Sequence, residues 1–301
     1  MFPHPQDLLA SACKVQRDND LMIAAGSTTL TPYPRSLTLV DEESLRRQAT
    51  NPGLVIKRDY SDGSLWTFLP KRDDKDGRAR REHIRKRFLE TQKCYQHITQ
   101  LPYPSWLAQP YMPGLVEKGE IRAFLVGGKL RYAIHTWPGP NEDLYMDLVE
   151  NYTPLNLLEW VYRLSCWKLT SNSLYRPGPT VHHPLLHRGG KTPSMCNENL
   201  TEEEATSGHG VFKKFVEDTV QAVANAENSR RGDSSSSLQV FCRVDVGVLD
   251  HQGSYHYFVS EIERSLTVGL FRRTTSVVSV MLNSAIEQIP EYARRSRGFG
   301  V

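Results

Sequence analysis

The stretch EIRAFLVGGKLRYAIHTW, residues 120–137, constrains the fold of this chain more than any other. Two runs of alternating apolar residues flank the pair Gly127-Gly128. Glycine readily takes the positive φ angles that a two-residue hairpin turn requires. We therefore predict a β-hairpin in this stretch, and such hairpins build antiparallel sheets.

Other segments repeat this mixture of hairpins and helices. A second hairpin is predicted from 54–58 and 65–69, and a third strand pair from 239–249 and 255–262, joined by the turn DHQG. Apolar spacing predicts helices at 41–48, 78–100, 155–169, 211–228 and 277–289. Residues 170–210 are predicted to be a long loop insertion and 229–237 a flexible linker. The order lacks a regular β-α-β-α rhythm, which favours the α+β class with antiparallel sheets.

Composition excludes several classes of protein. The chain of 301 residues is long enough for one large domain or two modest ones. A net charge of only +3 gives no indication of binding to nucleic acid or to an anionic membrane. The basic run RARREHIRKR in 78–87 has acids beside it, so a solvated helix face is preferred to a nucleic-acid site. No apolar run approaches the roughly 20 residues of a membrane span, and no signal-peptide pattern opens the chain. Five scattered cysteines without a CxxC motif favour reduced thiols and a cytoplasmic protein.

Acidic residues gather on the two last predicted strands. Glu261 and Glu263 are two residues apart and therefore share a strand face, as do Arg243 and Asp245 on the preceding strand. If the strands pair through their short connection, Asp245 lies across from Glu261. Such carboxylates suit Mg²⁺, and the alternative is an outer face of ion pairs with nearby basic residues. Spacing alone favours the ion pairs.

Lys57 ends the apolar strand GLVIK and precedes a turn at 60–64. A lysine in this place reaches a phosphate group as a point charge, or it is an ordinary exposed lysine at a strand end. The turn is not a Walker A loop, because the pattern G-x-x-x-x-G-K-[ST] is absent from the sequence.

Taken in order, five segments resemble the motifs of the ATP-grasp superfamily. These segments are CKVQRDNDLMIAAGSTTLTPYPRS, LVIKRDYSDGS, LAQPYMPG, EIRAFLVGGKL, and the pair CRVDVGVL and YHYFVSEIE. The resemblance extends from about residue 12 to about residue 290. It implies two α+β subdomains that hold ATP between antiparallel sheets, as in D-alanine–D-alanine ligases and glutathione synthetases. The implied parts are 1–50 as the start of the core, 51–112 as a lid and 113–301 as the C-terminal part.

The resemblance also implies a role for particular residues. Phosphate contacts fall to Lys14 and Lys57, and the adenine contacts to Gln109, Tyr111 and Met112. Glu120, or with less support Glu117, takes the ribose position, while Arg122 and Arg243 hold the phosphate or a developing oxyanion. Asp245, Glu261 and Glu263 are the implied Mg²⁺ ligands. The histidines at 182, 183 and 187 are interpreted as loop residues.

The implied activity is that of an ATP- and Mg²⁺-dependent ligase, which phosphorylates a small carboxylate and joins it to an amine or another nucleophile. Three departures from the family pattern favour an alternative, a degenerate protein that binds nucleotide or a partner without ligation. Glu263 replaces the usual Asn, few residues precede Lys14 where relatives have a domain, and the loop after Lys57 is poor in glycine. Three alternatives for that domain stay open: the chain is trimmed, a partner subunit supplies the domain, or the protein works without it. The partners considered are a small-molecule carboxylate, an amine or amino acid, and either a second copy of the chain or that partner subunit.

Overall fold

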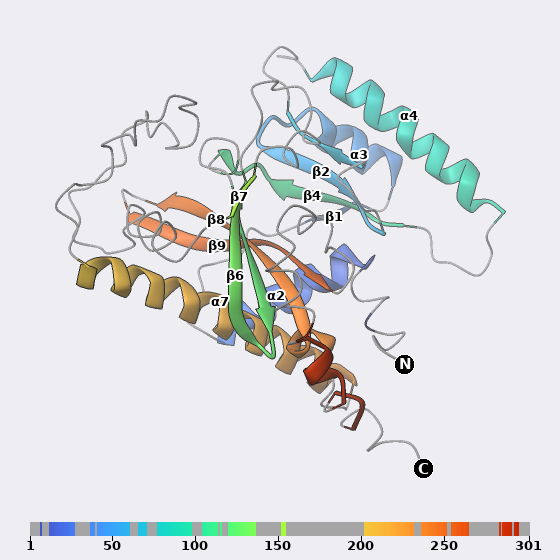
Figure 1. The fold of residues 1–301 in the computed structure, drawn as a ribbon. Coiled ribbons are helices and arrows are strands. Elements are labelled where there is room, and N and C mark those ends of the chain that lie inside the picture. The colour runs from blue at the N-terminus through green and yellow to red at the C-terminus, as the bar shows by residue number, and fades with distance from the viewer. Residues whose placement is uncertain are drawn as a thin grey trace.

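The computed structural model contains two antiparallel sheets with helices packed on them (Figure 1). It describes residues 7, 12–27, 37–39, 41–60, 66–70, 77–97, 104–113, 115, 120–136, 152–154, 202–231, 236–251, 254–264, 283, 285–290 and 292–294. The chain is thus of the α+β class that the sequence predicts. The predicted helix at 155–169, Glu117, the three loop histidines and residues 61–64 of the turn after Lys57 lie outside this part of the chain.

The smaller sheet has the strand order β1-β4-β2-β3. Its strands are β1 (Leu37–Leu39), β2 (Leu54–Arg58), β3 (Thr67–Phe68) and β4 (Trp106–Pro110). The bounds of β2 are those predicted, and β3 returns antiparallel to it, with Lys57 opposite Thr67. Two helices accompany this sheet, α3 (Glu42–Ala49) and α4 (Arg78–Tyr95) (Figure 1).

An apolar cluster fills the space between these helices and the smaller sheet. Ile84 and Phe88 of α4 pack against Trp106 of β4, and Leu45 of α3 joins them. Most of the basic run on α4 faces solvent, as predicted, but Arg80 is buried. Its guanidinium donates to the backbone oxygens of Asn51, Leu54 and Phe68, so this charged group ties α4 to two strands.

The larger sheet has the order β7-β6-β5-β8-β9. Its strands are β5 (Glu120–Val126), β6 (Lys129–Thr136), β7 (Tyr152–Pro154), β8 (Phe241–His251) and β9 (Ser254–Arg264). Gly127 and Gly128 have φ angles of 61° and 69°, which confirms the predicted glycine turn between β5 and β6. β8 and β9 pair antiparallel, which confirms the last predicted strand pair.

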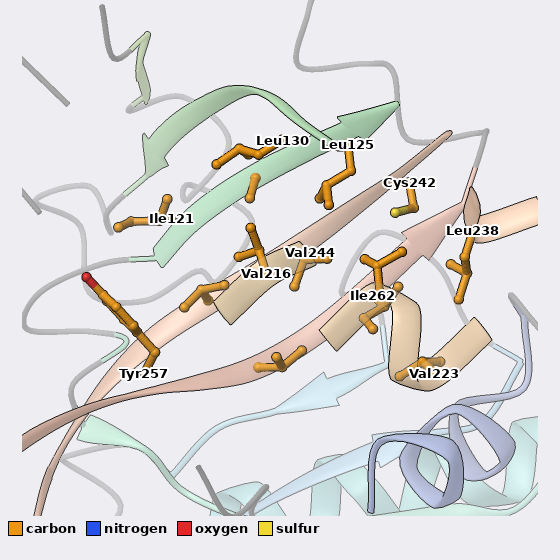
Figure 2. Packing of buried hydrophobic residues seen from close by; sticks show 14 of the residues in the cluster. Ile121, Leu125, Leu130, Val216, Val223, Leu238, Cys242, Val244, Tyr257 and Ile262 are labelled. Carbon is orange, nitrogen blue, oxygen red and sulfur yellow. The ribbon is translucent and has the colours of Figure 1, made fainter. Parts of the chain in front are cut away.

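Two helices, α2 (Lys14–Ser27) and α7 (Glu202–Arg231), cover one face of the larger sheet. Figure 2 shows the core beneath them, where Val216 and Val223 of α7 meet Val244 of β8 and Ile262 of β9. Each such side chain contributes about 1.5–3 kcal/mol by leaving water. Because strand residues alternate in direction, this apolar face leaves the opposite face of β5, β8 and β9 for polar side chains.

The structure corrects two expectations from the sequence. Residues 202–210 belong to α7 rather than to a loop, because acids favour a helix N-terminus and two glycines cost only about 1 kcal/mol each. The predicted linker at 229–237 is helical up to Arg231, and Ser236 and Ser237 are buried at the start of the 3₁₀ helix η2 (Ser237–Gln239). Ser236 donates to Glu227 at 2.6 Å, which holds this segment in place.

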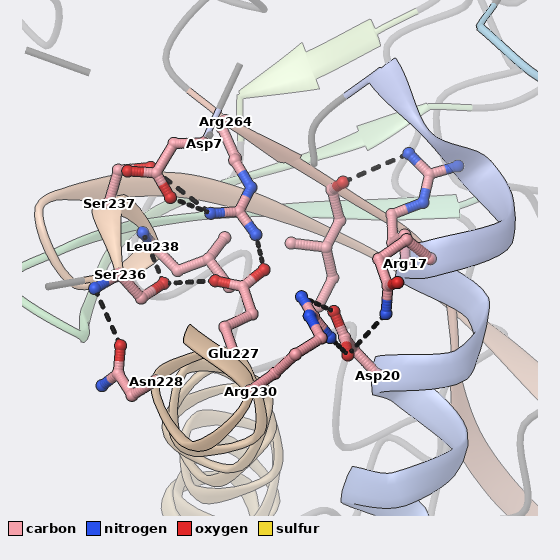
Figure 3. A network of polar contacts seen from close by, with 12 residues as sticks. Asp7, Arg17, Asp20, Glu227, Asn228, Arg230, Ser236, Ser237, Leu238 and Arg264 are labelled. Carbon is pink, nitrogen blue, oxygen red and sulfur yellow. Dashed lines mark hydrogen bonds and ion pairs between the residues drawn. The ribbon is translucent and has the colours of Figure 1, made fainter. Parts of the chain in front are cut away.

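A buried polar network joins distant parts of the chain at the edge of this core. The Asp7 carboxylate contacts Arg231 at 2.7 Å, Arg264 at 3.1 Å and the Tyr292 hydroxyl at 2.6 Å. Arg264 also pairs with Glu227, as Figure 3 shows. Burial lowers the pKa of Arg264 to about 10, although Asp7 opposes that change. The network fixes the end of β9, one residue beyond Glu263.

The predicted division at residues 50 and 112 stays a prediction. The chain leaves the smaller sheet at Pro110, which ends β4, and enters the larger sheet at Glu120, which begins β5. None of the helices in the described ranges is long and apolar enough to cross a membrane.

Candidate functional site

A bulge in β9 directs the acidic residues to the polar face of the larger sheet. Asp245 pairs with Glu261 but the next residue, Val246, pairs with Val259, so Ser260 is an extra residue between them. Strict alternation would place Val259 and Glu261 on one face. The bulge separates them, so that Val259 and Ile262 both enter the core.

The predicted pairing of the two acidic strands is confirmed, with Asp245 directly opposite Glu261 and Arg243 opposite Glu263. Asp245 is buried, and both of its oxygens accept from Arg243, at 2.6 and 2.7 Å. Burial alone would lower the pKa of Arg243, but the Asp245 carboxylate more than offsets this and raises it. The bidentate pair holds both side chains rigidly on β8.

Arg17, from the second turn of α2, reaches the same cluster. One of its nitrogens lies 2.8 Å from a carboxylate oxygen of Glu261, and another donates to the backbone oxygen of Ile262 at 3.3 Å. Burial by itself would raise the pKa of Glu261, but Arg17, Lys57 and Lys14 together hold that pKa well below its usual range. Glu261 is therefore a stable anion among several cations.

Lys14 and Lys57 converge on this anion from different parts of the fold. Lys14 begins α2 and Lys57 lies near the end of β2 in the smaller sheet. Burial lowers the pKa of each lysine, while the Glu261 carboxylate acts against that change in both. The positive charge of Arg17, which lies near both lysines, lowers the pKa of each, and Lys57 also lowers the pKa of Lys14. The structure thus brings together the two lysines that the sequence singled out.

Glu120 and Arg122 extend the cluster onto β5. The Arg122 side chain lies 3.4 Å from Glu120, and the Ser260 hydroxyl donates to Glu120 and contacts the backbone oxygen of Asp245 at 3.2 Å. Burial raises the pKa of Glu120 to about 7, and the nearby Asp245 charge adds to that rise. The bulge residue therefore connects β9 to β8, its neighbour in the sheet, and to β5 on the other side of β8.

Glu263 differs electrostatically from Glu261, its neighbour on the same face. Burial raises the pKa of Glu263 to about 7, and the Glu261 charge contributes to the rise. Two carboxylates so close disfavour double ionisation, because like charges repel in a poorly solvated site. Without an added cation, Glu263 thus gains a proton near neutral pH.

The segment proposed for adenine contacts leads from the smaller sheet toward the larger one. Gln109 is buried in β4 opposite Val55. Tyr111 and Met112 are half-buried, and the Tyr111 amide donates to the Gly53 backbone oxygen at 2.8 Å. This bond anchors the segment to the residue that precedes β2, four residues before Lys57.

The carboxylates suit Mg²⁺ by their chemistry, since hard oxygen donors are the ligands this ion prefers. Within the described ranges, however, no group of three or more His, Cys, Asp or Glu side chains is arranged to hold a metal ion. Arg243 occupies both oxygens of Asp245, and Arg17 faces Glu261. Guanidinium groups supply the positive charge that these two acids need.

Sequence reasoning missed three residues that shape this site: Arg17, Asp59 and Ser260. Arg17 follows Lys14 by one helical turn, so helical spacing could have indicated a shared face. Asp59 is buried just beyond Lys57, and its contacts link segments 45 residues apart. No local pattern announces the bulge at Ser260.

Comparisons by sequence find no relative, since no protein family and no curated protein matches the chain. Solved structures do match. The D-cycloserine synthetase DcsG gives a TM-score of 0.48 at 13% identity, over 93% of this chain and 73% of that one. The ATP-grasp ligase PsnB, solved with a minimal precursor, Mg and ADP, gives 0.42 at 12% identity, over 93% and 60%. D-alanine–D-alanine ligase from Bacillus anthracis, complexed with ATP, gives 0.41 at 13% identity, over 97% and 68%.

Among these solved structures, PsnB is described as a ligase of the ATP-grasp type, the superfamily that the motifs resemble. The chain spans 73% of the length of DcsG and 60% of that of PsnB. TM-scores below 0.5 at such identities assign no role to any residue. A function for this chain has to rest on the contacts of its own site.

Proposed function

We propose that this chain is an ATP- and Mg²⁺-dependent ligase of the ATP-grasp type, which joins a small carboxylate to an amine or another nucleophile. The observation that carries the proposal is the convergence of Lys14 and Lys57 on Glu261. These residues come from α2, from the smaller sheet and from the larger sheet. A polyanion held between two sheets needs cations from both sides, and the half-buried Lys14 and Lys57 are suited to this role.

The proposed roles follow the chemistry of each side chain. Lys14 and Lys57 neutralise the phosphates as point charges, and Arg122 and Arg243 hold phosphate oxygens. Glu120 accepts from the ribose hydroxyls, and Gln109, Tyr111 and Met112 contact the adenine. Asp245, Glu261 and Glu263 would hold Mg²⁺, which when bound offsets the negative charge of the phosphates.

The proposed reaction needs positioning and charge neutralisation rather than a protein nucleophile. A carboxylate oxygen of the substrate attacks the γ-phosphorus, and ADP leaves with the bonding electrons. The amine then attacks the acyl carbon, loses a proton and displaces phosphate. Half-buried cations such as Lys57 stabilise the charge that develops on the phosphoryl oxygens in the first step.

A second candidate is a protein that binds nucleotide without ligation. The observation in its favour is that Asp245 and Glu261, two of the three proposed Mg²⁺ ligands, are already paired with arginines. The two candidates share nucleotide binding and differ in turnover. An assay of ADP release with pooled amino acids and small carboxylates separates them, since ligation requires release above background in at least one pool.

Nucleotide binding itself is tested by thermal unfolding. Mg²⁺ with ATP should raise the Tm of the wild-type protein, and the double variant Asp245→Ala/Glu261→Ala should lose this gain. Asp218→Ala is a matched control, because this exposed residue of α7 pairs with Lys214 outside the site. Absence of any Tm gain in the wild-type protein would refute both candidates.

A further inference from the structure

A buried carboxylate, Asp59, lies where the two lysine-bearing segments meet. It follows Lys57 by two residues at the end of β2 and is only 2% exposed. Its Oδ1 accepts from the backbone amide of Lys14 at 2.5 Å and from that of Tyr60 at 3.0 Å. The Cys13 thiol donates to Oδ2 at 3.6 Å. One side chain thus binds the first residue of α2 and the residue before it.

The two sides of this contact belong to different parts of the fold. The Asp59 amide donates to the Ser105 backbone oxygen at 2.8 Å. This bond fixes Asp59 to the residue that directly precedes β4. α2 is fixed to the larger sheet by the Arg17 contact with Ile262 and is held to α7 by the pair Asp20–Arg230. Asp59 therefore connects the smaller sheet to the larger one through the start of α2.

Electrostatic interactions strengthen the contact between the Asp59 carboxylate and the start of α2. The first amides of a helix carry partial positive charge, so a carboxylate at the start of α2 stabilises that end. Burial raises the pKa of the Cys13 thiol, which keeps it a neutral donor toward Asp59. Tyr60 has a φ of 48°, a backbone conformation that is uncommon outside glycine, and it lets the Tyr60 amide reach the same carboxylate.

We infer that Asp59 is a positioning residue that holds Lys14 and Lys57 as a pair, because it joins the start of α2 to the end of β2. The inference rests on the proposed function, in which both lysines contact the phosphates of a nucleotide. Asp59 itself touches no reacting atom. Loss of the Asp59 carboxylate should leave both lysines present but no longer held beside each other. The affinity for phosphate groups should therefore fall, while the affinity for the nucleoside should not.

The test compares the Kd values of Mg·ADP and of adenosine for Asp59→Ala, at a temperature well below the Tm of every variant. We expect the Kd for Mg·ADP to rise about tenfold, the effect of one lost charge-assisted hydrogen bond, while that for adenosine changes less than about twofold. Asp59→Asn keeps an oxygen for the Lys14 amide and should restore most of the affinity. An equal loss for both ligands would overturn the inference, since general destabilisation does not distinguish phosphates.

Two controls complete the experiment. Asp41→Ala removes an aspartate that caps α3 by accepting from the Ser44 amide at 2.6 Å, remote from the site, and should leave both Kd values unchanged. In a Lys14→Met background, Asp59→Ala should cost less than about twofold, because the pair is already broken. A full tenfold cost in that background would overturn the inference.

If the wild-type protein binds no nucleotide, that result refutes the proposed function but leaves the role of Asp59 in joining α2 to β2 to be tested. Hydrogen exchange then tests the connection directly. Asp59→Ala should remove protection from the Lys14 amide, whereas Asp41→Ala and Asp59→Asn should retain it. Unchanged protection in Asp59→Ala would show that Asp59 does not hold the start of α2.

Discussion

The Arg17 guanidinium lies 2.8 Å from the Glu261 carboxylate, where it joins α2 to the strand that carries two of the proposed metal ligands. Their side chains are 12% and 29% exposed, so water screens this pair only in part. The pair shows how the site satisfies its acids without a metal ion. It also implies that any cation bound by Glu261 competes with Arg17.

Arg17→Gln is therefore expected to lower the free energy of unfolding by about 1–3 kcal/mol, since it removes one of several cations from a half-buried carboxylate. Mg²⁺ should restore part of this loss, because Glu261 becomes available to the ion. Urea unfolding with and without Mg²⁺ measures both effects. Arg46→Gln, which breaks an exposed pair with Glu42, should cost less than about 1 kcal/mol and show no Mg²⁺ effect. An equal Mg²⁺ response in wild type and Arg17→Gln would contradict the competition.

Lys57→Met is expected to stabilise the fold while it abolishes nucleotide binding. Burial lowers the pKa of Lys57, so the folded state binds its proton less well than the unfolded state does. The charged lysine thus costs stability below its folded pKa, and the cost vanishes as pH rises above about 10.5, the usual lysine value. Unfolding of wild type and variant at neutral and at high pH measures the difference, which should shrink with pH. Lys129→Met, at an exposed lysine paired with Glu217, should not stabilise the fold.

Glu120 makes stability depend on pH in the opposite range. Its folded pKa of about 7 exceeds the model-peptide value of 4.5, so its contribution is full below about pH 4.5 and is lost as pH rises through 7. Glu120→Gln removes this titration and should flatten the decline between these values by up to about 3 kcal/mol. Chemical unfolding across that pH range provides the measurement. Glu43→Gln, at an exposed position of α3, is the control, and an identical pH profile for wild type and Glu120→Gln would refute the prediction.

Ser260→Ala should destabilise the protein by about 1–2 kcal/mol, since it removes the hydroxyl that contacts Glu120 and the Asp245 backbone oxygen. Deletion of Ser260 should leave Glu261 and Glu263 on the polar face, because only the extra residue of the bulge is lost. Unfolding measurements test the first variant, and a crystal structure tests the second. Entry of Glu261 into the core of the deletion variant would contradict this account of the bulge.

Much of the fold follows from short-range patterns in the sequence. Gly127-Gly128 predicts a hairpin because few other dipeptides take two positive φ angles, and LVIKR predicts β2 because its residues favour a half-buried strand. The antiparallel pairing of β8 with β9 follows from the short turn between them, whereas the bulge at Ser260 shifts the partner of Asp245 to Glu261. These features depend on neighbours in the chain, which a sequence displays directly.

The parts that sequence reasoning missed depend on contacts between distant segments. Arg17 looks like any polar residue of an amphipathic helix until α2 meets β9. Asp59 looks like a turn residue until α2 begins beside it, and Arg80 looks solvated until it reaches three backbone oxygens. Each is a buried polar group whose partners are set by tertiary packing, so local propensity says nothing about it.

The contacts of Asp7 bear on how this protein is prepared for experiments. A version shortened to begin at Cys13 looks harmless by sequence, because the removed residues lie before the first of the five motif segments. It would strip Arg231 and Arg264 of a carboxylate that is itself 1% exposed, at 2.7 and 3.1 Å. Two guanidinium groups would remain in a poorly hydrated interior with less counter-charge, and the strand that ends in Arg264 would loosen beside the site. Removal of a dozen residues that precede the first motif would thus disturb the strand that carries Glu263.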